Sequence, residues 1–407
     1  MAELNWQGKD EIRAWLLRSQ AGTNLPIGPG FSGVIAGDNL PVLQSLQASY
    51  AGQVDVIYAD PPYNTGNRHW LYNDDASSPR AMHELQQLMG DKALLLSRED
   101  RWLNLMYARF ALMKPLLAQS GVLFVSIGEE HMPHMRHLLS ELFGPEHFLG
   151  TLKWKRKRKP SFLDRHIAVT TEYILVYARD KEQVKPLSVS QGSDTTRPVL
   201  NAGNKMVTRR LRAGTVVHQP DGDWPSGTYG ARSLTYELLE NAKIRDGVLM
   251  TDVPVRGPFR VNQTVLDDTV FVSRLWGLRR HVHKAEQKPR PIADLLLDVG
   301  TNEDASADLA KNGIAFPFAK PTELILYLLR STVQNNPNAL ILDPFAGSGT
   351  TLLATWQLNE EDGGKRTTIL IEEDENVIDQ VLLPRLHASQ SAQPFSLCDA
   401  RVVSKGS

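Results

Sequence analysis

Cysteine is almost absent from this sequence of 407 residues, which holds only Cys398. A single cysteine cannot form a disulfide within the chain, and it cannot build a cysteine-rich zinc module. Histidine offers no substitute, because His131, His134 and His137 recur at every third position without a fourth ligand. We therefore predict no internal disulfide and no metal site.

Long apolar runs are missing as well. A membrane-spanning helix needs about 20 predominantly apolar residues, and no segment approaches that length. Residues 1–18 carry mixed charge, whereas a secretory signal is basic and then apolar. We expect a cytoplasmic protein that contacts no membrane. The apolar content of 42% is enough for a large core, and a chain of this length is expected to form two or three domains.

A strong net charge is the third absence. The formal net charge is −1, so nothing draws the whole chain toward a polyanion. Nucleic-acid binding would depend on local basic clusters. The residues that we predict to contact phosphates are Lys153, Lys155, Arg156, Lys157, Arg158 and Lys159 in one cluster and Arg209 and Arg210 in another. On composition alone, a solvated face explains such clusters equally well.

Most of the chain alternates β-type apolar runs with helical ones. This alternation predicts an α/β fold with a mostly parallel sheet covered by helices. The expected helices are residues 11–18, 102–117, 134–143, 321–333 and 350–358. The expected strands are residues 34–36, 54–59, 121–127, 172–178, 339–342 and 367–371.

The periodicity weakens after about residue 181, where Gly, Pro and Asp are scattered through short β-like pieces. We interpret this segment as a mixed or β-rich domain inserted between two halves of one α/β domain. The predicted organisation is an N-terminal extension (1–30), a first half (31–180), the inserted domain (181–311), a second half (312–395) and a tail (396–407).

The string Asp60-Pro61-Pro62-Tyr63 follows the predicted strand at residues 54–59. Its prolines stiffen a turn and offer no backbone donor, which leaves the Pro61 carbonyl exposed. The Asp60 carboxylate and this carbonyl could each accept one N–H of an exocyclic amine and aim the nitrogen lone pair at an electrophile. Tyr63 could stack on the base that carries the amine. The alternative is a proline turn with a buried tyrosine.

A second string, from Asp343 to Gly349, follows another predicted strand and includes Phe345 and Gly347. Gly347 and Gly349 permit positive φ and lack Cβ, so the backbone can approach a bulky ligand just before the helix that begins near Thr350. No lysine follows Gly349, which argues against a phosphate-binding loop. An acidic loop suits a positively charged cofactor without phosphate.

The strand at residues 367–371 ends in Glu372. A carboxylate at this position is well placed to accept both ribose hydroxyls of an adenosine. We prefer Glu372 to Glu373 because it is the first residue past the apolar run. An acidic start to the next helix is the alternative interpretation.

At these residues the chain resembles the β-group DNA amino-methyltransferases, and most closely the modification subunits of type III restriction–modification systems. Two features differ from that family: Gly128 stands where relatives usually carry Asp, and the chain is short for a type III modification subunit. The similarity covers residues 31–180 and 312–386. Segments that match in the family's order are Gly37-Asp38-Asn39-Leu40, Asn64-Thr65-Gly66, Tyr72-Asn73-Asp74 and residues 102–107, 121–127, 171–177, 316–321 and 361–366.

The resemblance implies a Rossmann-like, S-adenosylmethionine-dependent methyltransferase fold with a mostly parallel seven-stranded sheet. It also implies a circularly permuted motif order, with the inserted segment as a target-recognition domain. The implied catalytic residues are Asp60, Pro61, Pro62 and Tyr63. The implied cofactor residues are Asp38 near the adenine, Lys320 before the helix beside the cofactor, Asp343, Phe345, Gly347, Gly349 and Thr350 in the loop, and Glu372 at the ribose. Trp70 and Tyr72 would lie on a loop that closes over the flipped base. The alternative is that both side chains only pack against the rest of the protein.

The reaction that the resemblance implies is direct methylation of N6 of a flipped adenine in double-stranded DNA. Methylation of cytosine at carbon 5 needs a thiolate nucleophile, which Cys398 in the tail does not supply. Members of the wider family that act on RNA or glutamine carry Asn in place of Asp60. Asp at this position resembles the adenine enzymes and Ser resembles the cytosine-N4 enzymes, so adenine N6 is favoured and cytosine N4 stays open.

A catalytically silent DNA-binding subunit of a restriction–modification complex is the alternative from another functional class. A decayed site would be expected to have lost Asp60, Tyr63 or the glycines, and all are present. The resemblance further implies a homodimer, and it leaves a restriction subunit open as a partner.

Overall fold

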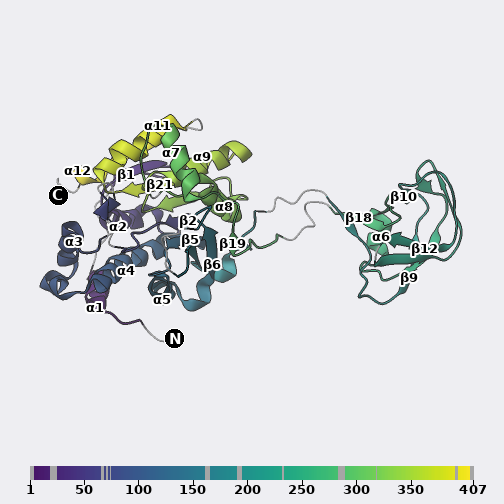
Figure 1. Ribbon diagram of the computed structural model, residues 1–407, viewed down its shortest axis with the longest axis horizontal. Coiled ribbons are helices and arrows are strands. Elements are labelled where there is room, and N and C mark those ends of the chain that lie inside the picture. The colour runs from purple at the N-terminus through teal and green to yellow at the C-terminus, as the bar shows by residue number, and fades with distance from the viewer. Residues whose placement is uncertain are drawn as a thin grey trace. The chain divides into compact units, whose positions relative to one another are not determined.

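The computed structural model describes residues 4–18, 25–65, 68–69, 72–73, 75–160, 166–189, 195–231, 233–282, 289–317, 319–389 and 393–403. The chain divides into two compact units. Unit 1 is Met1–Val189 together with Arg290–Ser407, and unit 2 is Ser190–Pro289. Figure 1 shows unit 1 as a sheet flanked by helices and unit 2 as a body built mainly of strands.

The elements of unit 1 account for most of the chain. Its α-helices are α1 (Lys9–Arg18), α2 (Asn39–Tyr50), α3 (Pro79–Met89), α4 (Arg98–Leu116), α5 (Met132–Phe143), α7 (Asn302–Lys311), α8 (Thr322–Val333), α9 (Thr350–Asp362), α10 (Glu375–Val377), α11 (Leu383–Ala388) and α12 (Ala400–Val403). Its 3₁₀ turns are η1 (Gly90–Leu95), η2 (Pro145–His147) and η3 (Lys181–Gln183), and η5 (Ile378–Leu382) is a π-helical turn. Its strands are β1 (Gly33–Ala36), β2 (Val54–Ala59), β3 (Arg68–His69), β4 (Tyr72–Asn73), β5 (Leu117–Ile127), β6 (Phe148–Lys155), β7 (Thr171–Ala178), β19 (Leu295–Leu296), β20 (Leu340–Asp343), β21 (Thr367–Glu372) and β22 (Ser396–Asp399).

Within the described residues, nine of these strands form one sheet in the order β19-β6-β7-β5-β2-β20-β21-β1-β22. The strands from β5 to β22 in this order pair in parallel, whereas β7 runs antiparallel to β5 and β6. Strand β6 is not among the strands expected from the sequence pattern. The resemblance implies a seven-stranded sheet, and the short strands β19 and β22 add to its two edges. The predicted tail at 396–407 therefore begins as part of the sheet.

Helices cover both faces of the sheet. Side chains alternate along each strand, so an apolar strand presents apolar side chains to both faces, and each face needs a cover. In β2, Ile57 and Ala59 join the core that includes α2, α4 and α5, whereas Val56 and Tyr58 join the core that includes α8 and α9. Strands buried on both faces appear in the sequence as continuous apolar runs. Every helix and strand expected for this part of the chain is confirmed, with ends that shift by a few residues.

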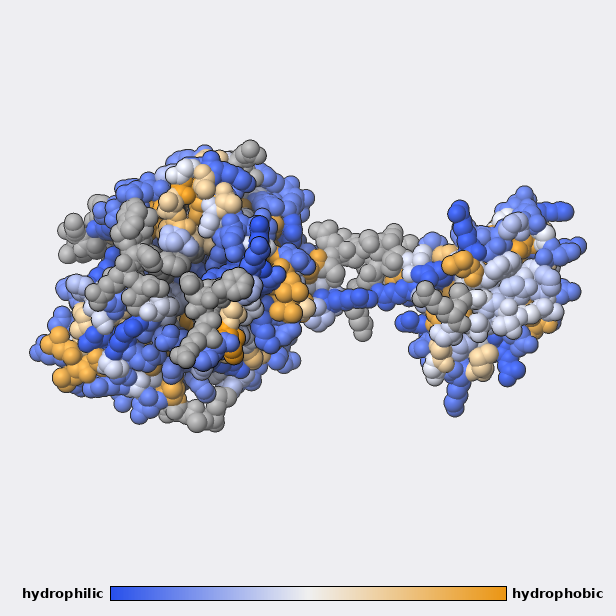
Figure 2. Space-filling model, in the orientation of Figure 1, coloured by the Kyte–Doolittle hydropathy of each residue, from blue (hydrophilic) through white to orange (hydrophobic). Residues whose placement is uncertain are grey.

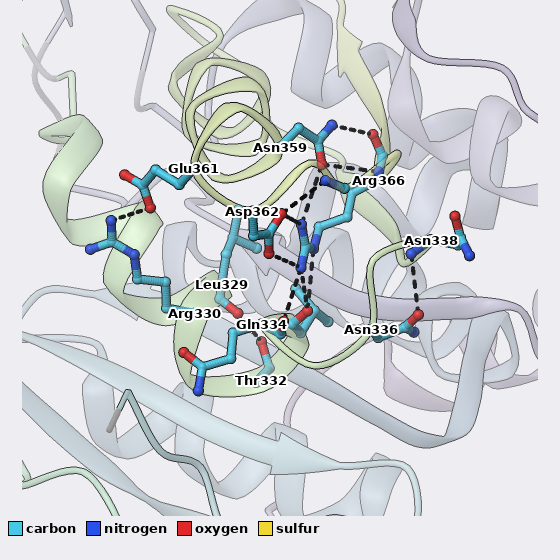
Figure 3. A network of polar contacts seen from close by, with 12 residues as sticks. Leu329, Arg330, Thr332, Gln334, Asn336, Asn338, Asn359, Glu361, Asp362 and Arg366 are labelled. Carbon is cyan, nitrogen blue, oxygen red and sulfur yellow. Dashed lines mark hydrogen bonds and ion pairs between the residues drawn. The ribbon is translucent and has the colours of Figure 1, made fainter. Parts of the chain in front are cut away.

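Arg366 ties the ends of two helices to the start of β21 (Figure 3). Its buried guanidinium donates to the carbonyls of Val333 (3.0 Å) and Gln334 (3.2 Å), where α8 ends, and to the Asp362 carboxylate (2.7 Å), where α9 ends. The Asn359 side chain pairs with the backbone of Arg366. This network fixes β21 at the end opposite to Glu372.

Unit 2 is narrower than the segment at 181–311 that the sequence suggests for an inserted domain. Strand β19 pairs with β6, and Ala305 and Leu309 of α7 pack against Val377 and Val381, so both elements belong to unit 1. Apolar packing therefore draws residues 290–311 into the α/β unit.

Within its described residues, unit 2 contains one sheet in the order β11-β14-β15-β10-β17-β18-β8 and another in the order β12-β13-β16-β9. Their shared core contains Trp224, Tyr236 and Phe259. The elements are β8 (Thr195–Pro198), β9 (Val207–Leu211), β10 (Val216–Val217), β11 (Gly222–Trp224), β12 (Gly227–Ala231), β13 (Leu234–Leu238), β14 (Ala242–Arg245), β15 (Val248–Leu249), β16 (Val253–Gly257), α6 (Gln263–Thr269), β17 (Val270–Val272) and β18 (Leu278–Val282).

The described residues of the N-terminal extension predicted at 1–30 belong to unit 1. Trp6 donates its indole N–H to Asn104 of α4 (2.9 Å), and α1 lies against α3 and α4. The face in Figure 2 is mostly hydrophilic, with separate apolar patches. Among the described residues, none of the helices has the length and apolar character needed to cross a membrane.

Candidate active site

The two strings singled out in the sequence lie at neighbouring strand ends. Strand β2 pairs in parallel with β20, and Ile57 lies opposite Leu342. Neighbouring parallel strands end at the same edge of a sheet, so Asp60, just after β2, and Asp343, at the end of β20, share that edge. Burial raises the pKa of Asp343 to about 7, and the negative charges of Asp60 and Glu372 contribute to the rise.

The Asp60 carboxylate is held on both oxygens. Oδ1 accepts the Tyr63 hydroxyl (2.8 Å), and Oδ2 accepts the Lys320 ammonium (2.6 Å). The Trp102 indole N–H donates to the Pro62 carbonyl (2.7 Å) and fixes the turn. In the described part of the chain no donor pairs with the Pro61 carbonyl, which remains available as an acceptor. Burial, followed by the charge of Asp60, raises the pKa of Tyr63 well above its usual value, so the hydroxyl stays protonated.

Lys320 lies at the amine motif rather than only at the cofactor side to which the sequence assigned it. Its side chain is 8% exposed, and its ammonium contacts Asp60, the Tyr63 oxygen (3.2 Å) and Glu172 (3.8 Å). Burial alone would lower the pKa of Lys320, but the carboxylates of Asp60 and Glu172 raise it above its usual value. Lys320 is therefore a buried cation.

Glu172 of β7 completes this charged group, and the sequence analysis missed it. Its side chain is 8% exposed, and Oε1 accepts Arg156 Nη1 (2.8 Å). Its signal in the sequence is a carboxylate at the start of an apolar strand, where a buried charge requires a partner.

The loop between β20 and α9 is shaped by two glycines with positive φ, 50° at Gly347 and 77° at Gly349. The Asp343 carboxylate closes the turn, because it accepts the Phe345 backbone N–H (3.0 Å) and the Thr351 hydroxyl (2.6 Å). The Phe345 ring is half-buried and packs on the core that includes α2 and α4.

Glu372 ends β21 beside this loop. Its Oε2 accepts the Gly347 N–H (2.8 Å), and its Oε1 accepts the N–H groups of Glu373 (2.9 Å) and Asp374 (3.0 Å). A carboxylate has about four acceptor positions. Three are used within the chain, which leaves capacity for one further donor, and the bonds to both ribose hydroxyls stay a prediction. Burial raises the pKa of Glu372.

Asp38 lies next to Glu372 because β1 pairs with β21 and the Gly37 N–H donates to the Glu372 carbonyl (2.8 Å). Asp38 caps α2 by accepting the Leu40 N–H (2.9 Å). The Arg109 guanidinium lies 3.5 Å from its carboxylate. Asp38, Glu372 and the glycine loop thus lie at adjacent strand ends.

Thr350 is turned into the protein. Its hydroxyl donates to the Lys320 carbonyl (3.2 Å) and accepts Arg385 Nη1 (2.7 Å). Arg385, which is 2% exposed, also donates to the Ser348 hydroxyl (2.7 Å). Arg385 is a second residue that the sequence analysis missed, and it connects the glycine loop to the backbone of Lys320.

The basic cluster at 153–159 belongs to β6 and the turn after it. Trp154 lies within this cluster but is fully buried and donates its indole N–H to the Gly300 carbonyl (2.9 Å). Arg156 pairs with Glu172, and Arg158 pairs with Asp304. The contacts with DNA predicted for this cluster are open to its other members, which are Lys153 (3.8 Å from Asp294), the half-buried Lys155 and Lys157, and the exposed Lys159.

In unit 2, Arg209 is half-buried and Arg210 is exposed on β9. Two of the recurring histidines, His131 and His134, both face Glu99, at 3.1 and 3.2 Å. The side chains of Trp70 and Tyr72 lie outside the described residues.

Comparison with known proteins identifies the family. A model of the DNA methylase family N6_N4_Mtase matches residues 54–382. The chain belongs to this family of DNA methylases. The matched residues 54–382 include the string that begins at Asp60, the string that begins at Asp343 and strand β7, which carries Glu172.

Several relatives share this similarity. The chain is 29% identical to the Mod subunit of the type III restriction-modification enzyme StyLTI of Salmonella typhimurium, over 84% of this chain and 52% of that subunit. It is 26% identical to the EcoP15I Mod subunit of Escherichia coli, over 85% and 59%. It is 25% identical to the type II methyltransferase M.KpnI of Klebsiella pneumoniae, over 85% and 82%. The chain spans about half the length of the Mod subunits named here.

Solved structures were compared as well. The PvuII DNA methyltransferase (cytosine-N4-specific) gives a TM-score of 0.43 at 13% identity, covering 89% of this chain and 90% of that one. The M1.HpyAVI–SAM complex gives a TM-score of 0.37 at 14% identity, covering 86% and 96%.

Proposed function

We propose that this chain is a sequence-specific DNA methyltransferase that transfers a methyl group from S-adenosylmethionine to N6 of an adenine rotated out of double-stranded DNA. The observation that carries the proposal is the parallel pairing of β2 with β20, which places Asp60 and the loop after Asp343 at one edge of the sheet. Membership of the DNA methylase family supports methyl transfer to DNA.

The residues at that edge fit S-adenosylmethionine. The carboxylates of Asp60, Asp343 and Glu372 are close enough to raise the pKa of Asp343, after burial, and a cation among them would relieve that repulsion. When bound, the cofactor supplies an electrophilic methyl group on a positively charged sulfur. Asp38 and Glu372 would hold its adenosine, and the backbone at Gly347 and Gly349 would lie against it.

The amine motif fits an exocyclic amine. Asp60 and the free Pro61 carbonyl would accept its two N–H groups and direct the nitrogen lone pair toward the methyl group. The Asp60 carboxylate would also stabilise the positive charge that develops on nitrogen. Tyr63 would stack on the extruded base, which offsets part of the energy of extrusion.

The test is methyl transfer from labelled S-adenosylmethionine to unmethylated DNA, followed by separation of the nucleosides. We expect N6-methyladenine from the wild-type protein and a loss of at least about 100-fold for Asp60→Ala, because a group that stabilises developing charge is removed. N4-methylcytosine as the product would contradict the assignment of the base. Cofactor binding without transfer to any DNA would favour a catalytically silent DNA-binding subunit.

We also infer that unit 2 is a target-recognition domain. It is a separate compact unit within the family region, and Arg209 and Arg210 on β9 supply cations for phosphate contacts. We also propose a homodimer, as the family resemblance implies, and the similarity to Mod subunits supports association with a restriction subunit. Size-exclusion chromatography with light scattering tests the dimer.

A further inference from the structure

Two donors from within the chain already bind the Asp60 carboxylate, which the target amine needs as an acceptor. Asp60 Oδ1 accepts the Tyr63 hydroxyl at 2.8 Å, and Oδ2 accepts the Lys320 ammonium at 2.6 Å. An ammonium and an exocyclic amine are both N–H donors, so Lys320 can take the place of the substrate amine at Oδ2 of Asp60. A cation bound to Asp60 also neutralises the carboxylate and opposes the positive charge that develops on the reacting nitrogen.

Lys320 has a second carboxylate within reach. Glu172 Oε2 lies 3.8 Å from the lysine nitrogen, so a shift of about 1 Å gives a normal charge-assisted hydrogen bond. The four-carbon stem of lysine permits such a shift. The backbone of Lys320 is anchored, because its carbonyl accepts the Thr350 hydroxyl at the base of the glycine loop.

The surrounding charges keep the ammonium inside the protein. The lysine side chain and Glu172 are each 8% exposed, and Arg156 holds the other oxygen of Glu172 at 2.8 Å. A buried cation requires a carboxylate partner at all times. Asp60 and Glu172 both lie near the one lysine and can provide that partner in each of two positions.

We propose that Lys320 is a positioning residue that occupies the amine site at Asp60 until the target base enters, and that Glu172 then takes over its ammonium. This inference rests on the proposed function. The substrate class for the site is a neutral aromatic amine, because only a neutral donor can replace the ammonium without adding a second cation. Glu172 is thus required for turnover although it does not touch the base.

The experiment compares Glu172→Gln, the double variant Lys320→Met/Glu172→Gln and the wild type in single-turnover methyl transfer. In Glu172→Gln the ammonium has no second carboxylate and stays on Asp60. We expect the rate of methyl transfer to fall about 10- to 100-fold, the range for one hydrogen bond to a charged group, with cofactor affinity unchanged. The double variant lacks the ammonium and keeps the net charge of the group, so its rate should rise above that of Glu172→Gln.

Recovery in the double variant separates a positioning role from a structural one. If Glu172 only stabilises the fold or orients Arg156, removal of Lys320 as well adds a second defect, and the double variant is as slow as Glu172→Gln or slower. That result would overturn the inference. Glu141→Gln is the matched control, because Glu141 forms a half-buried ion pair with Lys9 away from β2, and its rate should equal that of wild type.

A crystal structure with sinefungin and a duplex containing the methylated sequence gives a readout independent of rate. We expect the Lys320 nitrogen on Glu172 and the target N6 on Asp60, and a lysine still bound to Asp60 beside the extruded base would contradict the inference alone. A wild-type protein that methylates no DNA would instead remove the proposed function, and the inference with it.

Discussion

At the scale of single residues, the candidate site is a group of carboxylates with few compensating cations. Asp60, Asp343 and Glu372 could be predicted as site residues because each follows an apolar run at the end of a strand. The contacts of Lys320 and Glu172 could not be predicted. They depend on the pairing of β7 with β5 and on the turn before α8, and these two features leave no local pattern in the sequence. The contacts of Arg385 with the glycine loop could not be predicted for the same reason.

Asp343 gives a prediction about pH. Burial raises its pKa to about 7, so below pH 7 the carboxyl group is largely protonated in the cofactor-free protein. A positively charged cofactor favours the ionised form, and binding therefore releases a proton. We expect the affinity for S-adenosylmethionine to rise between about pH 5 and 7, by at most about tenfold per pH unit, and to level off above that range.

Calorimetry in two buffers of different ionisation enthalpy measures this proton release. S-adenosylhomocysteine, which lacks the sulfonium charge, serves as the control and should show a weaker dependence on pH. In Asp343→Asn the dependence should largely disappear. An equally steep dependence in that variant would assign the proton to another group.

At the scale of elements, long periodic segments were predictable, and short or charged strands were not. Strand β6 was missed because charged residues alternate with its inward-facing residues, which hides an apolar pattern of period two. Strands β19 and β22 are too short to show any pattern, and only pairing with a formed sheet defines them.

Buried and solvent-facing residues of the basic cluster at 153–159 should respond differently to substitution. Trp154→Ala removes a fully buried ring and should lower the free energy of unfolding by about 3–5 kcal/mol, as measured by denaturant titration. Lys157→Ala/Lys159→Ala should leave stability nearly unchanged and weaken DNA binding. In this double variant the slope of log affinity against log salt concentration should become less steep by about 1 to 2, because each lysine that neutralises a phosphate contributes about one unit to the slope. An unchanged slope would exclude both lysines from the DNA interface.

At the scale of the whole molecule, the order of the motifs along the chain and the weak periodicity after residue 181 were enough to predict an α/β unit interrupted once. The exact limits of unit 2 were not predictable, because packing of α7 and pairing of β19 assign residues 290–311 to unit 1. The DNA sequence that unit 2 would read leaves no pattern in the chain.

If unit 2 contacts DNA and unit 1 binds the cofactor, substitutions in unit 2 should affect DNA binding alone. Arg209 and Arg210 form no ion pair within the described residues, whereas Arg212 pairs with Asp252 and Asp267. We expect Arg209→Ala/Arg210→Ala to weaken DNA binding and lower the salt slope by about 1 to 2, with cofactor affinity unchanged. Arg212→Ala is the control and should leave the salt slope unchanged. Loss of cofactor binding in the double variant would contradict separate roles for the two units.

The most direct test of the account is single-molecule sequencing of DNA from a methylation-free host that expresses this chain, beside hosts that express Asp60→Ala and Asp55→Asn. Asp55 lies on the same strand as Asp60 but at its other end, where it accepts the Leu340 N–H. We predict N6-methyladenine within one short sequence motif for the wild type and for Asp55→Asn, and none for Asp60→Ala. Modified adenines that persist in Asp60→Ala, or modified cytosines in the wild type, would contradict the account.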